Sequence, residues 1–112
     1  MVTWEEYSLG AARTIPADPT DDERRLVNFA LGVAGEAGEV ADLIKKHVFH
    51  QHDLDPERLI EELGDVLWYV AALARTLDVA LEDVARQNLA KLRRRYPAGF
   101  DAARSRTRPE AR

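Results

Sequence analysis

Cysteine is absent from the 112 residues of the sequence, which excludes disulfide bonds and metal sites built from thiolates. The sequence also lacks an apolar run of about 18 residues and a segment that resembles a signal peptide, so no membrane partner is expected and the expected location is the cytoplasm. The formal net charge of −4 argues against a general nucleic-acid-binding protein. The C-terminal end is locally basic, because of residues 93–95 and the arginines after residue 103.

Apolar and charged residues are both abundant, at 46% and 32% of the chain. This balance is typical of a soluble helical protein and not of a disordered one. The length suits one domain, and no alternating pattern of apolar and polar residues predicts a strand. We therefore expect an all-α domain over residues 1–97, followed by a loosely held tail over residues 98–112.

Capping signals divide the domain into four expected helices. A threonine followed three residues later by a glutamate has the spacing of a capping box, and this occurs at Thr3 and at Thr20. Asp55 stands directly before a proline, which is the pattern of an N-cap followed by the first helical residue. The expected helices cover residues 4–13, 21–47, 56–77 and 81–95. Because the loop between the second and third helices is short, these two are expected to form an antiparallel hairpin.

The expected hairpin carries two pairs of acidic residues, each with a spacing of three. Glu36 and Glu39 lie in the stretch GEAGEV, and Glu62 and Asp65 lie in EELGDV. At about 100° per residue, both pairs lie beside the apolar faces of their helices, on flanks of the same rotational sense. In an antiparallel hairpin such flanks share one side, so the four carboxylates are expected to converge on one groove. In the second helix, the expected centre of the apolar face is formed by Ala30, Val33, Ala37, Val40 and Ile44.

Four converging carboxylates repel one another strongly unless a cation lies between them. Hard oxygen ligands that leave positions for water and phosphate suit Mg²⁺, with Mn²⁺ as a further candidate. The alternative is that each pair is a solvated charge on a helix flank, which is the commoner case for one pair alone. The matched repeat of the two pairs favours a metal site.

The last expected helix supplies positive charge. Lys91 and Arg95, with Asn88, share a stripe with the apolar residues of that helix, so they project from its apolar side. In one interpretation they extend to solvent near a helix C-terminus. In the other they bind phosphate oxygens that also contact the metal, with Lys46 as a weaker candidate on the flank of Glu39.

The stretches GEAGEV, EELGDVLWYV and NLAKLRRRYP, in this order, resemble the all-α nucleotide pyrophosphohydrolases of the MazG-like family. The family pattern is ExxE, a gap and ExxD, and here the gap is the 22 residues 40–61. The resemblance implies an enzyme that hydrolyses a nucleoside triphosphate between the α and β phosphates, giving the monophosphate and pyrophosphate. It further implies that Glu36, Glu39, Glu62 and Asp65 bind Mg²⁺ and that Asn88, Lys91 and Arg95 hold the phosphates.

Two further roles follow from this chemistry. One carboxylate is expected to accept a proton from the attacking water, with Glu36 as the first candidate and Glu61 as its rival. Tyr69 lies one helical turn after Asp65, so its ring could stack on the base. Packing in the core is the commoner role for such a residue.

Other interpretations stay open at this point. A related enzyme, phosphoribosyl-ATP pyrophosphatase, shares the expected fold, and a non-catalytic helical module would bind a cation or a basic partner without turnover. A ferritin-like di-iron site is disfavoured because no histidine follows a glutamate by three residues. His47 and His50 have a spacing that could bind zinc, but their position at a helix end favours a capping or solvent role.

Residues 66–74 contain no charged side chain, so the third helix is apolar around most of its circumference. A chain of this length has few other elements to cover such a helix. We expect a homodimer or homotetramer in which two hairpins complete a four-helix bundle. The acidic groove then lies near the interface and takes up residues of the neighbouring chain.

Overall fold

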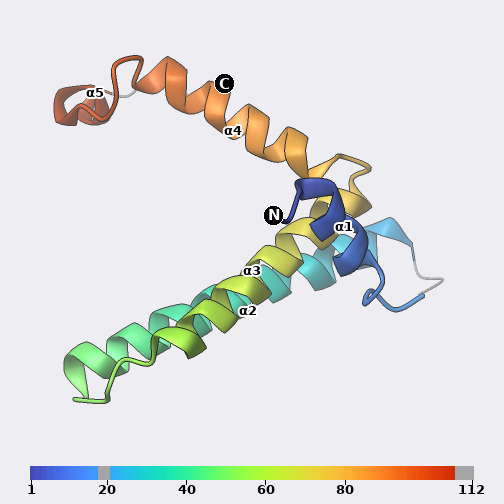
Figure 1. Cartoon of the computed structure of the whole chain (residues 1–112), viewed down its shortest axis with the longest axis horizontal. Coiled ribbons are helices and arrows are strands. Elements are labelled where there is room, and N and C mark those ends of the chain that lie inside the picture. Colours follow the sequence, from blue (N-terminus) through green and yellow to red (C-terminus); the bar gives the residue numbers. More distant parts are fainter. Residues whose placement is uncertain (18–20, 108–112) are drawn as a thin grey trace.

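The computed structural model describes residues 1–17 and 21–107 and confirms the all-α prediction (Figure 1). Its elements, in chain order, are α1 (Trp4–Ala12), α2 (Asp22–Phe49), α3 (Pro56–Thr76), α4 (Leu81–Arg95) and α5 (Ala102–Arg106). No strand occurs in these described ranges, where the only β-type pairing is an isolated bridge between Pro97 and Gly99. None of the described helices has the length and apolar character needed to cross a membrane.

Two of the predicted helix starts are confirmed by their capping hydrogen bonds. The hydroxyl oxygen of Thr3 accepts a bond of 3.0 Å from the backbone N–H of Glu6 at the start of α1. The carboxylate of Asp55 accepts bonds from two backbone N–H groups at the start of α3, where Pro56 occupies the first turn. Both caps satisfy N–H groups that have no partner within the helix.

The start of α2 is capped by Asp21, one residue after the threonine that the sequence pattern favours. Its carboxylate accepts a bond of 2.9 Å from the backbone N–H of Arg24. The expected cap, Thr20, lies outside the described residues. An aspartate suits this position as well as a threonine does, because its oxygen satisfies the same backbone donor and its charge favours the positive helix end.

The helices α2 and α3 form the expected antiparallel hairpin and lie side by side along most of their length (Figure 1). The ring of Tyr69 on α3 lies directly against Gly32 on α2, where any β-carbon would overlap it. Phe29, Trp68 and Tyr69 form a cluster of rings whose centroids are 4.9 to 6.4 Å apart. The aromatic volume of this cluster fixes how α2 is rotated against α3.

This rotation differs from the one expected from the apolar pattern of α2. The buried residue of the helix is Phe29, at 5% exposed, whereas Ala30, Ala37 and Ile44 of the expected stripe are exposed. The pattern is misleading because it gives a small apolar residue such as alanine the same weight as a large one. Packing depends on side-chain volume, and here also on Gly32, whose missing side chain leaves space for the ring of Tyr69. As a result Glu36 faces α3 more directly than expected.

The helices α1 and α4 cover the C-terminal half of α3. Ala11, Ala71 and Leu81 form a buried cluster, against which Tyr7 and Trp68 pack. The indole N–H of Trp68 also donates a bond of 2.8 Å to the hydroxyl of Thr14, just after α1, and so ties that segment to α3. Much of the charge-free stretch 66–74 is therefore covered within the chain, and Ala71, Ala72 and Ala74 are buried.

The helix α4 leaves this junction and runs away from the hairpin, with α5 at its far end (Figure 1). The guanidinium of Arg104 in α5 donates bonds of 2.6 and 3.2 Å to the carbonyl oxygens of Arg95 and Arg94. These bonds attach α5 to the last turn of α4. The short helix lies inside the segment 98–112 and was not predicted from the sequence.

The chain is more extended than a compact domain of its length. Its radius of gyration is 17.1 Å, whereas about 13 Å is expected for a compact fold of this size. Large apolar side chains stay exposed along the hairpin, among them Val48 at 60%, Ile60 at 65% and Leu63 at 52%. A chain that leaves this much apolar surface uncovered has an incomplete core when it is alone.

We predict that Gly32→Ala lowers the free energy of unfolding by about 1–3 kcal/mol, because the new methyl group displaces the ring of Tyr69. Gly10→Ala is the matched control, since a β-carbon there meets no atom within 4 Å. The control should leave stability unchanged or raise it by up to about 1 kcal/mol. Chemical denaturation followed by circular dichroism measures both, and equal effects at the two positions would contradict the packing described here.

Candidate metal centre

Three of the four predicted metal ligands converge on one point of the hairpin. Glu36 of α2 and Glu62 and Asp65 of α3 each offer one carboxylate oxygen, and these oxygens all lie within 4.8 Å of one another. Glu36 and Glu62 are partly buried, and Asp65 is exposed. The hairpin therefore joins Glu36 to two carboxylates that lie 26 and 29 residues later in the sequence, and the three are here called the acidic triad.

Glu39, the fourth predicted ligand, lies one helical turn after Glu36 and is exposed. Its oxygens are not part of the acidic triad, but its charge acts on Glu36. The rotation of α2 explains this, because turning Glu36 toward α3 leaves Glu39 further out on the same flank. Glu61, the rival candidate for the general base, is also exposed and lies outside the triad.

The other carboxyl groups of the triad change the pKa of Glu36. A hydrogen bond shared with the carboxyl group of Glu62 raises the pKa of Glu36 above its ordinary value of 4.5. Partial burial and the charges of Asp65, Glu62 and Glu39 raise this pKa further. Protonation of Glu36 is therefore favoured where these carboxylates converge without a cation.

The first helix adds a residue that the sequence did not identify as part of this region. Burial raises the pKa of the Tyr7 hydroxyl, and the charge of Asp65 raises it further. Tyr7 on α1 therefore lies close enough to the triad for the charge of Asp65 to change the pKa of its hydroxyl. The capping box predicts α1 itself, but no local signal shows where that helix packs.

The predicted phosphate-binding residues do not gather at the triad within one chain. Asn88, Lys91 and Arg95 lie on α4, which runs away from the hairpin (Figure 1). Lys46 lies on α2, where its ammonium group forms an ion pair of 2.8 Å with the carboxylate of Asp42. This pair lowers the pKa of Asp42, with a smaller contribution from Lys45.

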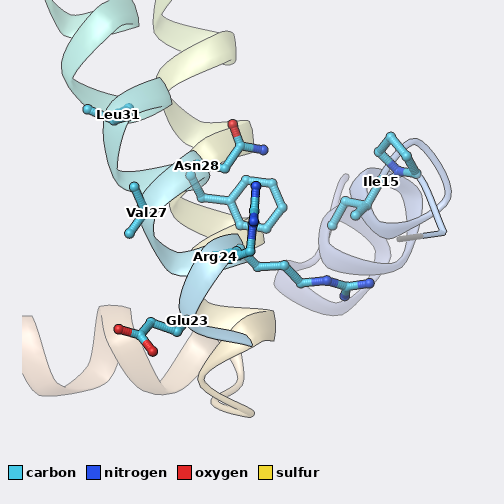
Figure 2. A pocket seen from close by; sticks show the side chains of 9 residues that line it. Ile15, Glu23, Arg24, Val27, Asn28 and Leu31 are labelled. Atoms are coloured by element: carbon cyan, nitrogen blue, oxygen red, sulfur yellow. The ribbon is translucent and has the colours of Figure 1, made fainter. Parts of the chain in front are cut away.

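A pocket of about 630 Å³ lies at the N-terminal end of α2 (Figure 2). Ile15, from the segment after α1, lines it together with Val27, Asn28 and Leu31 of α2. None of the predicted site residues lines this pocket. It lies about two helical turns before Glu36 along α2, since Asn28 precedes that residue by eight positions.

The chemistry of the triad fits a hard divalent cation. Carboxylate oxygens are the preferred ligands of Mg²⁺, and two ligands of one Mg²⁺ lie at most about 4.2 Å apart. Small rotations of the three side chains would bring their oxygens to this spacing. The exposed side of the triad leaves room for water and for a phosphate group, which Mg²⁺ normally keeps among its ligands.

We predict that the metal-free protein becomes less stable, relative to Glu36→Gln, as the pH rises above about 4.5. The raised pKa means that the folded protein holds the proton on Glu36 more tightly than the unfolded chain does. This stabilisation is complete below the unfolded pKa and is lost as the pH rises through the folded pKa. Glutamine mimics the protonated form at every pH.

Urea denaturation of both proteins between pH 4.5 and neutral pH, in the presence of a chelator, measures this difference. Glu61→Gln serves as the control for removing one acidic charge nearby. A stability difference between wild type and Glu36→Gln that does not change with pH would contradict the prediction.

Comparisons with known proteins place the chain in a family. Residues 26–100 match the family model described as the MazG nucleotide pyrophosphohydrolase domain. The chain is also 43% identical over 102 aligned residues to Gene 37 protein of Mycobacterium phage L5, a match that covers 83% of this chain and 88% of the phage protein. No solved structure matches the chain. The matched range includes the acidic triad and all of α4, and the chain belongs to the MazG nucleotide pyrophosphohydrolase family.

Proposed function

We propose that the protein is a Mg²⁺-dependent nucleoside triphosphate pyrophosphohydrolase that cleaves between the α and β phosphates and releases pyrophosphate. The observation that carries the proposal is the acidic triad on the hairpin of a chain that belongs to this family. A triad of oxygen donors with an open side suits a metal ion that must also contact phosphate. The proposed catalytic domain extends over residues 1–97.

In this proposal Glu36, Glu62 and Asp65 hold Mg²⁺, and Glu39 joins them when substrate is bound. The bound ion would neutralise charge on the phosphates and favour attack by water. Glu36 is the proposed general base, because its carboxylate lies in the acidic triad, where the attacking water would be held. Glu61 is the alternative, since it is exposed and adjacent to a triad member.

The β and γ phosphates are proposed to bind Lys91 and Arg95, with Asn88 as a hydrogen-bond donor. Charged donors of this kind form strong bonds with phosphate oxygens. Lys46 is a further candidate, and its exposed ion pair with Asp42 contributes too little to hold it away from a phosphate.

The base is proposed to lie toward the N-terminal end of the groove. Tyr69 is partly buried there, and its ring contacts Phe29, which also lines the pocket beside Asn28. Stacking on Tyr69 or entry into that pocket would place the base beside α2 and the phosphates toward Glu36.

The function is tested by incubating the purified protein with ribo- and deoxyribonucleoside triphosphates and Mg²⁺, and by separating pyrophosphate from orthophosphate among the products. We expect pyrophosphate and the monophosphate in equal amounts. Orthophosphate would indicate cleavage at the γ phosphate. Phosphoribosyl-ATP, included in the same panel, tests the related enzyme, and no product from any substrate would favour a non-catalytic module.

We predict that Glu39→Gln and Asp65→Asn each lower kcat by about a hundredfold or more while the fold is retained. Removing one of several repelling charges should not destabilise the metal-free protein. Steady-state kinetics at saturating Mg²⁺ measures the loss, and circular dichroism checks the fold. Activity near that of the wild type in both variants would remove these residues from the metal site.

We predict that Lys91→Ala and Arg95→Ala each weaken binding of a non-hydrolysable triphosphate by roughly ten- to a hundredfold, as expected for the loss of a charged hydrogen bond. Binding of the monophosphate should change much less, because the lost contacts are to the β and γ groups. Arg93→Ala removes the same charge from another side of α4 and is the matched control. Calorimetry measures the affinity of the wild type and of all three variants for both nucleotides, and equal losses for the two nucleotides would contradict the assignment.

A homodimer or homotetramer is proposed as the active form. Apolar side chains along the hairpin are uncovered beside the acidic triad, since Leu63 lies about 100° around α3 from Glu62. Ile44 and Val48 of α2 are uncovered as well, at 45% and 60% exposed. A second hairpin packed on this side would complete a four-helix bundle and bury the surface.

We predict that sedimentation equilibrium at micromolar concentration gives a dimer or a tetramer. Leu63→Lys should shift the distribution toward the monomer, because it places a charge in the proposed apolar contact. Glu57→Lys, a charge change at an exposed site near the start of α3, is the control. A folded and fully active wild-type monomer would contradict the proposal.

A further inference from the structure

The first helix packs close to the acidic triad, although it supplies none of the carboxylates. α1 lies beside α3 (Figure 1), and its buried residue Ala11 forms a cluster with Ala71 of α3. Tyr7 of α1 and Trp68 of α3 both pack against this cluster. Around α3, Asp65 lies about 60° from Trp68 and nearly one helical turn before it. The part of α3 that α1 covers therefore continues directly into the triad.

Two side-chain hydrogen bonds hold the end of α1 in this position. The indole N–H of Trp68 donates a bond of 2.8 Å to the hydroxyl oxygen of Thr14, and this hydroxyl donates a bond of 2.7 Å to the carbonyl oxygen of Ala11. Tyr7 lies about one turn before Ala11 and about 40° from it around the helix, so it shares the face that meets α3. Packing and polar contacts together thus fix where Tyr7 lies relative to α3.

The hydroxyl of Tyr7 is a donor that makes no hydrogen bond to any described residue. A tyrosine whose ring packs in a core usually finds a partner for this group. Burial raises the pKa of the hydroxyl, and the charge of Asp65 raises it further. The group therefore keeps its proton at neutral pH and can donate it in a hydrogen bond. The carboxylate of Asp65 is the acceptor whose charge already acts on it.

Asp65 is also the member of the triad whose orientation is least restricted. Glu36 and Glu62 are partly buried and share a hydrogen bond with each other, whereas Asp65 is exposed. Its carboxylate accepts no hydrogen bond from the described part of the chain. A carboxylate that binds a metal through one oxygen has a second oxygen free, and a hydrogen bond to that oxygen fixes the ligand's orientation.

We propose that Tyr7 is a positioning residue of the metal site: its hydroxyl donates a hydrogen bond to the carboxylate of Asp65 and holds this ligand in the orientation that binds the cation. Tyr7 itself contacts neither the metal nor the substrate. The role makes α1 a third helix of the site, beside the two that supply the carboxylates. It rests on the metal site of the proposed function, but it does not depend on turnover.

The variant Tyr7→Phe tests the role, because it keeps the ring and removes only the hydroxyl. We expect the affinity for Mn²⁺, measured by electron paramagnetic resonance without substrate, to fall by about ten- to a hundredfold. Tyr96→Phe is the matched control, since Tyr96 is also partly buried but lies at the end of α4, where its ring packs on Phe100. It should bind Mn²⁺ as the wild type does. Equal affinities in the wild type and Tyr7→Phe would overturn the positioning role.

Denaturation of the metal-free proteins separates positioning from packing. Tyr7→Phe retains the ring in the cluster, so its midpoint in urea should be that of the wild type. Tyr7→Ala removes the ring as well, and its midpoint should be clearly lower. If the midpoint of Tyr7→Phe falls as far as that of Tyr7→Ala, the hydroxyl stabilises the fold itself and the positioning role is wrong.

Nuclear magnetic resonance identifies the acceptor of the hydrogen bond. Tyrosine labelled with carbon-13 at Cζ gives one signal for each of the three tyrosines, and the phenylalanine variants assign the signals. The Tyr7 signal should move in Asp65→Asn and when Mg²⁺ is added, whereas the Tyr96 signal should stay in place. A Tyr7 signal that is unmoved in both experiments would contradict the contact with Asp65.

The outcomes also distinguish this role from the proposed function. A wild type without saturable Mn²⁺ binding contradicts the metal site itself and the positioning role with it. A wild type that binds Mn²⁺ as tightly as Tyr7→Phe does contradicts only the positioning role, and the proposed function then stands.

Discussion

The close approach of Tyr69 to Gly32 determines how the two long helices meet. Because position 32 has no side chain, the ring of Tyr69 lies against the backbone of α2, and Phe29 and Trp68 close around it. This contact sets the rotation of α2 in the hairpin. The rotation turns Glu36 toward α3, one helical turn further along α2. The apolar contact and the acidic site are thus consecutive parts of one helix interface.

The interface between α2 and α3 brings together negative charges that repel one another and so oppose its formation. The carboxylates of Glu36, Glu62 and Asp65 meet at one point, and a shared hydrogen bond together with their repulsion raises the pKa of Glu36. The aromatic cluster and the contacts of α1 and α4 on α3 stabilise the hairpin, and Tyr7 of these contacts lies near Asp65. Rigid elements can therefore hold a repulsive group in place, which is the arrangement a cation site needs before the cation binds. The remaining apolar surface is what a second copy would cover in the proposed oligomer.

Local chemistry explains why much of this architecture was predictable. The caps at Thr3 and Asp55, and the end of α4 at Arg95, depend on neighbouring residues and were predicted correctly. The matched spacing of the acidic pairs predicted a convergence that three of the four side chains confirm.

Features that depend on distant contacts were not predictable in the same way. The rotation of α2 depends on which ring meets Gly32, a contact across 37 positions that periodicity does not encode. The position of Tyr7 near Asp65 depends on where α1 packs, and the direction of α4 depends on its junction with α1 and α3. The roles of Tyr69, Lys46 and the cations of α4 stay predictions, because they require a bound nucleotide.

Binding of Mn²⁺ to the metal-free protein tests whether the hairpin carboxylates form one site for a divalent cation. Electron paramagnetic resonance counts free Mn²⁺ as the metal-free protein is titrated, without any substrate. We expect saturable binding that Mg²⁺ displaces, that Glu62→Gln abolishes and that the neighbouring Glu61→Gln retains. Unsaturable binding, or equal binding by wild type and Glu62→Gln, would contradict it.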